Sequence, residues 1–136
     1  MFLLLFVLAY YTGFLRENCG TDAGCFVERA VSCKPTDVFV LRDTNVYEYS
    51  IRGSVGECSL HVTLDRIAAG AAPDVEALVG KKMICSIPKE EMKTFMLDTF
   101  EGYLQYCHGE LKEGLLELVL RRVYGNLVGQ IGDLLK

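Results

Sequence analysis

The sequence predicts a disulfide-stapled α+β domain with a short N-terminal helix, a three- to four-stranded antiparallel meander and a C-terminal pair of helices. Three observations predict this fold class. Short runs of alternating apolar and polar residues fill the middle of the chain, helical spacing of apolar residues takes over after Pro88, and all six cysteines lie between Cys19 and Cys107. The 136 residues suffice for one ordinary domain.

The first helix of the domain is expected to begin at Thr21 or Asp22, since either side chain can cap a helix, and to run to about Cys33. Pro35 ends it, because proline cannot continue a helix. Four residues at helical spacing give this helix an apolar side: Phe26, Val27, Ala30 and Cys33.

Four stretches are predicted as strands: 38–41, 47–52, 58–65 and 83–87. The third has the cleanest alternation, with Cys58 and Leu64 on one face and His61 on the other. The residues at 43–45 predict a turn between the first two strands. Short connections between successive strands favour an antiparallel meander.

A first helical stretch is expected from Pro88, which suits a first helical position, to a break at Gly109. A second is expected from Glu110 to about Tyr124, with a continuation toward Leu135. The last stretch has an apolar surface wider than one sheet face requires. Its uses stay open between core packing, a homo-oligomer seam or protein partner, membrane-surface contact and a groove for a hydrophobic ligand. The candidate interaction surface is Leu111, Leu115, Leu118, Val123, Leu127 and Ile131.

The first fifteen residues contain no charged side chain, and only Thr12 and Gly13 are not hydrophobic. As a helix they would span about 22 Å, less than the roughly 30 Å of a bilayer core. The length suits a signal peptide or a short membrane anchor, and the missing basic residue before it favours the anchor. The alternative is an apolar first helix or strand packed in the core. The chain is therefore divided into an apolar signal or anchor (1–15), a cysteine-containing α+β domain (16–109) and an amphipathic C-terminal helix (110–136).

The six cysteines are disulfide candidates: Cys19, Cys25, Cys33, Cys58, Cys85 and Cys107. No two are spaced as C-x-x-C, so the signatures of zinc ribbons, thioredoxin-type motifs and c-type haem attachment are missing. An even count behind an apolar leader indicates an oxidising, extracytoplasmic compartment. Because Cys33 ends the helix that must cover the sheet, a bridge from it to Cys58 or Cys85 is attractive, and the choice stays open. The alternative is six reduced, buried thiols.

Few residues suggest chemistry. The net charge of −4 argues against a nucleic-acid partner, and no phosphate-binding loop or hydrolase motif is present. His61 is expected on the outer face of a strand, as a solvated side chain. Cys107 and His108 could be written as a nucleophile pair, but adjacent helical residues do not face each other, and a disulfide at Cys107 would remove the thiol. No catalytic residue, metal site or cofactor is predicted.

A resemblance to known proteins rests on four short segments: Asn18-Cys19-Gly20-Thr21-Asp22, Cys25-Phe26, Cys33-x-Pro35 and Met83-x-Cys85-x-x-Pro88. The chain resembles short, membrane-anchored, cysteine-containing extracytoplasmic proteins of small-genome archaea and similar microbes, over roughly residues 18–110. The resemblance implies an exported domain and transfers no catalytic residue.

The sequence thus predicts an exported or membrane-anchored binding or structural module, either attached to a membrane or secreted. One alternative is a carrier or sensor of an apolar, lipid-like ligand, with the C-terminal helices over a pocket. That pocket would be lined by Phe95, Phe100, Leu115 and Leu118. A second alternative is a thiol-dependent enzyme that uses Cys107 and His108.

Overall fold

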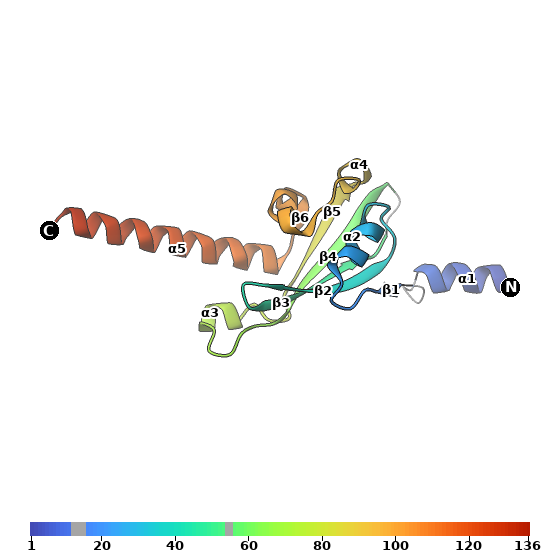
Figure 1. Cartoon of the computed structure of the whole chain (residues 1–136), viewed down its shortest axis with the longest axis horizontal. Coiled ribbons are helices and arrows are strands. Elements are labelled where there is room, and N and C mark those ends of the chain that lie inside the picture. Colours follow the sequence, from blue (N-terminus) through green and yellow to red (C-terminus); the bar gives the residue numbers. More distant parts are fainter. Residues whose placement is uncertain (12–15, 54–55) are drawn as a thin grey trace.

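The computed structural model describes residues 1–11, 16–53 and 56–136, except for the side chains of Tyr10 and Tyr11. In this part of the chain, six strands form one mixed sheet in sequence order (Figure 1). The strands are β1 (Glu17–Asn18), β2 (Thr36–Arg42), β3 (Asn45–Ile51), β4 (Glu57–Arg66), β5 (Lys82–Pro88) and β6 (Cys107–His108). The β1–β2 pair is parallel, and the other neighbours are antiparallel.

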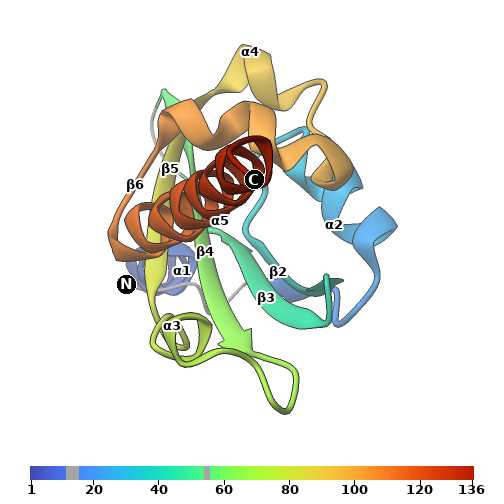
Figure 2. The ribbon, with the colours of Figure 1, turned by 90° about the vertical axis from the view of Figure 1, so that its left-hand side faces the viewer.

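Helices lie on one side of this sheet and at both ends of the molecule. They are α1 (Phe2–Tyr11), α2 (Ala23–Ala30), α3 (Pro73–Glu76), α4 (Lys89–Met92), the 3-10 helix η1 (Leu97–Tyr106) and α5 (Glu110–Leu134). In Figure 1, α1 and α5 lie at opposite ends of the longest axis. Figure 2, turned by 90°, shows α5 almost end on and places α2 and α4 on the same side of the sheet.

The predicted α+β class is confirmed, with corrections to the details. All four predicted strands are present with bounds that differ by one or two residues, but the sheet also contains β1 and β6. Each of these edge strands has two residues, too few to leave an alternating pattern. The description of the sheet as purely antiparallel was wrong at β1, because α2 crosses over between β1 and β2 and returns the chain in the same direction.

The expected C-terminal pair of helices is also corrected. Its first member is a short α4 followed by the 3-10 helix η1, which contains a kink at Thr99. Pro88 ends β5 and precedes α4 rather than occupying a helical position. The second member, α5, is one continuous helix of 25 residues.

The hydrophobic core lies on one face of the sheet, under α2, α4 and η1. Alternate residues of β3, β4 and β5 point toward it, as the period of two requires. Its largest sheet-derived side chains are Tyr49, Ile51, Leu60, Val62, Leu64 and Ile87. Phe26 of α2 packs edge-on against Tyr49, with ring centroids 6.3 Å apart, and against Phe95 at 6.2 Å. His61 points to the other face, as predicted, and is half-buried there.

The predicted turn between β2 and β3 is a two-residue hairpin. Arg42 and Asn45 are register partners, and the two residues between them, Asp43 and Thr44, have φ of 50° and 70°. Positive φ at both central positions matches the right-handed twist of the flanking strands. This turn fixes which residues of β2 and β3 reach the core face.

All six cysteines form disulfides, which confirms the predicted framework: Cys19–Cys25, Cys33–Cys58 and Cys85–Cys107. The partner of Cys33 is therefore Cys58 in β4 rather than Cys85. The first two bonds hold both ends of α2, one to the residue after β1 and the other to the sheet. The third joins register partners on β5 and β6.

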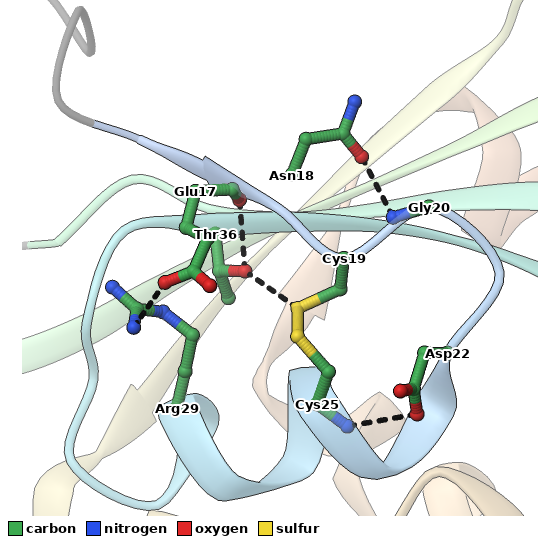
Figure 3. Close-up of a disulfide and its surroundings, with 8 residues drawn as sticks. All are labelled: Glu17, Asn18, Cys19, Gly20, Asp22, Cys25, Arg29 and Thr36. Carbon is green, nitrogen blue, oxygen red and sulfur yellow. Dashed lines mark hydrogen bonds and ion pairs between the residues drawn. A yellow bond between two sulfur atoms is a disulfide. The ribbon is translucent and has the colours of Figure 1, made fainter.

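Hydrogen bonds surround the Cys19–Cys25 bond (Figure 3). Asp22, one of the two predicted caps, accepts from the backbone N–H of Cys25 at 3.1 Å. The hydroxyl of Thr36 donates to the carbonyl of Glu17 at 3.0 Å, and its oxygen lies 3.3 Å from the sulfur of Cys19. Glu17 also pairs with Arg29 of α2. The short β1 is thus fixed to both β2 and α2.

Removing a disulfide should cost more where the bond closes a longer loop. The separations are 25 residues for Cys33–Cys58 and 6 for Cys19–Cys25. Loop-closure entropy then gives losses of about 3.5 and about 2.2 kcal/mol in the free energy of unfolding. Urea unfolding of the Cys33→Ala/Cys58→Ala and Cys19→Ala/Cys25→Ala variants measures both losses. A larger loss from the shorter loop would contradict the expectation.

Candidate binding groove

An open groove of about 590 Å³ lies on the core side of the sheet, between η1, α5 and the segment after α3. Its floor comes from strands: Tyr47, Tyr49, Val62, Leu64 and Met83. Its walls come from α3 and the residues after it, from η1 and from α5: Val75, Leu78, Phe100, Leu104, Leu115, Leu118 and Val119. Charged and amide side chains stand at its rim: Arg42, Asp43, Asn45, Glu101 and Arg122.

The α5 wall is positioned by a glycine between β6 and the helix. Gly109 has φ of 129°, and a Cβ added there would lie 2.7 Å from the carbonyl oxygen of Lys82. Only glycine allows this conformation and this close approach to β5. Two residues later Leu111 is fully buried, and Lys112 donates to the carbonyl of Cys107 at 2.9 Å. The first turns of α5 are therefore fixed to the domain.

A second glycine brings α5 against the opposite wall. A Cβ on Gly114 would lie 2.3 Å from a methyl carbon of Leu78, so the helix and the segment after α3 touch at this point. Lys81 adds an ion pair to Glu110 at 3.0 Å. These contacts fix α5 against the segment that follows α3, and both helices can be followed in Figure 2.

Charges of both signs stand at the rim. Arg42 donates to the carbonyl of Leu97 at 2.8 Å and pairs with Glu101 at 3.3 Å, which ties the end of β2 to η1. Arg122, on α5, makes no ion pair within the described ranges. The lining of the groove thus combines apolar and aromatic side chains with charged groups of both signs.

The tyrosines of the floor remain neutral over the whole physiological range. Burial raises the pKa of Tyr49 to about 12, against weaker opposing effects of Arg42, and burial likewise raises the pKa of Tyr47. Tyr49 packs edge-on against Phe100 with centroids 5.3 Å apart. The floor therefore offers aromatic surface and neutral hydroxyl groups rather than negative charge.

Three of the four residues expected to line a pocket do line the groove: Phe100, Leu115 and Leu118. The fourth, Phe95, lies in the core beside Phe26, and 5.1 Å from the ring of Tyr103.

The six residues of the candidate interaction surface do not share one face. Leu111 is fully buried, and Leu115 and Leu118 are half-buried in the groove wall. Val123, Leu127 and Ile131 are exposed.

Several groove residues were not anticipated from the sequence. Leu78 lies in a connection without clear periodicity, and the rim residues Arg42 and Glu101 carry no motif. Leu104 lies within the helical pattern expected after Pro88, but nothing marked it as a groove residue. Alternation in the strands did place Leu64 on the core face, but it carried no information that this part of the face would stay open.

The two predicted polar sites offer little chemistry. Cys107 is bonded to Cys85, so it supplies no thiol beside His108, whose side chain is exposed. His61 lies 3.2 Å from the hydroxyl of Ser59, and burial, followed by the charges of Arg52, Lys82 and Arg16, lowers its pKa. No group of three or more His, Cys, Asp or Glu side chains within residues 1–11, 16–53 and 56–136 could hold a metal ion.

A second feature lies outside the groove, at the N-terminus. All the apolar side chains from Met1 to Leu8 are exposed, and α1 contains no charge. A helix that is apolar on every side is normally covered by protein or lipid. No described helix is both long enough and apolar enough to cross a membrane.

Comparisons of this chain with protein-family models, with curated proteins and with solved structures find no match.

The raised pKa of Tyr49 makes stability dependent on alkaline pH. Above pH 10, the usual tyrosine pKa, the unfolded chain ionises while folded Tyr49 does not until about 12. The free energy of unfolding should therefore fall across this window, by at most about 1.4 kcal/mol per pH unit from this one group. Urea unfolding at several pH values should show a shallower fall for Tyr49→Phe. An unchanged slope would contradict the assignment.

Proposed function

We propose that the protein is an extracytoplasmic binding module, held at a membrane by α1, that takes the apolar part of a lipid-like amphipathic ligand into the groove. The observation that carries this proposal is the groove itself, a recess of about 590 Å³ whose lining residues are mostly apolar or aromatic. Its volume is within the range of sites that hold small organic ligands, about 300–1,000 Å³.

The chemistry of the groove supports a ligand with an apolar chain and a polar head. The chain would lie against the half-buried side chains of Leu104, Leu115 and Leu118, above a floor that includes neutral tyrosines. The head would stay at the rim, within reach of Arg122, whose guanidinium is not engaged by an acid among the described residues. A charged group placed deeper would lose its hydration without a partner.

The disulfides and α1 support the location. Three disulfides that use every cysteine are compatible with an oxidising compartment, where such bonds persist. The ten residues of α1 form a helix of about 15 Å, half the thickness of a bilayer core of about 30 Å. Such a helix fits a shallow anchor in one leaflet. The resemblance to anchored extracytoplasmic proteins agrees with this proposal.

A charge in the groove should abolish ligand binding. Leu118→Arg places a guanidinium in the wall, on a helix position that is only half-buried. The affinity for cis-parinaric acid, measured by fluorescence, should fall by at least roughly tenfold, because about 1.4 kcal/mol of desolvation suffices for that factor.

Met96→Arg is the matched control, since Met96 is 53% exposed and does not line the groove. It should bind the probe like the unsubstituted protein. If neither the unsubstituted protein nor the Met96→Arg variant binds the probe, or if both substitutions weaken binding equally, the groove is not a ligand site.

Carboxylates in α1 should remove membrane attachment. Leu4→Glu/Leu8→Glu puts two charges on one side of the helix, and each costs about 3 kcal/mol at the centre of a membrane. The unsubstituted protein should float with phosphatidylcholine vesicles in a density gradient, and the variant should remain at the bottom.

Leu41→Glu serves as the control, because Leu41 is 71% exposed on the domain rather than on α1. It should float normally. Flotation of the α1 variant would show that another surface binds the lipid.

A further inference from the structure

The outer face of the sheet, opposite the core, carries a polar cluster centred on His61. Ser59 and Thr63 are the neighbours of His61 on the same face of β4, and its register partners are Ser50 on β3 and Ile84 on β5. Side chains directly opposite each other in a sheet have Cβ atoms about 5 Å apart. The side chains of these residues therefore adjoin, on the side of the sheet that faces away from the groove.

Three cations stand around His61. Arg16, which precedes β1, donates to the hydroxyl oxygen of Ser50 at 2.7 Å. Arg52 and Lys82 lie diagonally across from the histidine, the first two positions after Ser50 and the second at the start of β5. Burial is the main cause that lowers the pKa of His61, and the three cations lower it further. All three charges are thus close enough to act on the imidazole ring.

The cluster has more hydrogen-bond donors than acceptors. Among the described residues, neither Arg52 nor Lys82 has an acid as an ion-pair partner. Ser50 is 3% exposed, and its oxygen accepts from Arg16, but no group in the described ranges accepts the proton of its own hydroxyl. Buried donors and charged donors gain most from an acceptor that carries negative charge. The arrangement therefore favours an anion at this place.

Acidic side chains do not neutralise the cluster. Four share this face of the sheet: Asp37, Glu48, Glu57 and Asp65. Asp37 already pairs with Arg16 at 3.0 Å, and Glu48 lies diagonally across from His61. The other two are each four positions from His61, about 13 Å along β4. Three cations against the two nearby acids leave one positive charge in excess, and protonation of His61 adds another.

We propose that this cluster binds a phosphate-type anion. The guanidinium groups of Arg16 and Arg52 and the ammonium of Lys82 surround the anion, and the hydroxyl of Ser50 donates to it. A phosphate group offers the negative charge and the several acceptor oxygens that these donors require. Inorganic phosphate and the phosphomonoester of a lipid headgroup share this chemistry. The site is separate from the groove and from the ligand proposed for it.

Only two histidines occur in the chain, so the imidazole signals of His61 and His108 can be followed separately by proton NMR. The full chain carries Leu4→Glu/Leu8→Glu to prevent association through α1, and it is titrated with acid in sodium phosphate and in sodium chloride of equal ionic strength. The pKa of His61 should be higher in phosphate by at least about 0.5, because a bound anion favours the imidazolium. The signal of His108, two strands away on β6, should respond less. An equal pKa of His61 in the two salts overturns the proposal.

Arg52→Ser/Lys82→Ser removes two of the three cations and should abolish the difference between the two salts. Lys93→Ser/Arg121→Ser is the matched control, since it removes one lysine and one arginine that are exposed at the end of α4 and on α5, on the core side of the sheet. This control should keep the difference. If it loses the difference to the same extent, the effect is general ionic screening and the site is refuted.

Once the pKa of His61 is found to rise, flotation distinguishes the two sources of phosphate. The protein with Leu4→Glu/Leu8→Glu is mixed with vesicles of phosphatidic acid in phosphatidylcholine. Flotation that Arg52→Ser/Lys82→Ser abolishes assigns the site to a lipid phosphomonoester, whereas a protein that stays at the bottom takes a soluble anion. These measurements involve no groove residue, so they stand or fall independently of ligand binding in the groove.

Discussion

Burial of a single face of the sheet is the constraint on which the other features depend. The core side chains of β3, β4 and β5 need a cover, and α2 and η1 are short elements that could not hold it by their own helical propensity. Disulfide bonds and polar contacts hold this cover in place instead. Disulfides fix both ends of α2, and the 3-10 helix is held by Arg42 at its start and by the Cys85–Cys107 bond just beyond its end.

The groove follows from the limits of this cover. α2 covers the part of the sheet where Phe26 meets Tyr49 and Phe95, and the groove lies beside this cluster, with Tyr49 in its floor. α5 forms one wall of the groove, and Gly114 brings the helix against Leu78 of the facing wall. The recess is thus bounded by segments that also stabilise the fold.

Local patterns predicted the fold well, and the site only in part. The alternation around Cys58 and Leu64, the cap at Asp22 and the turn at Asp43 are encoded by near neighbours, and all were recovered. The edge strands β1 and β6 depend on partners distant in sequence, and the disulfide partner of Cys33 depends on the final packing of α2. The groove depends on where packing stops, which no local pattern encodes.

One helix supplies both a wall of the groove and an exposed apolar end of the molecule. α5 is anchored near Gly109, forms the wall around Leu118 and continues to Leu134 without a break. The distances from Gly109 along the helix are about 14 Å to the wall and about 38 Å to the tip. Such a rod acts as a lever. A rotation of α5 about Gly109 would displace its tip roughly threefold farther than the wall at Leu118, so the angle at this one glycine sets the direction in which the far end of the molecule points.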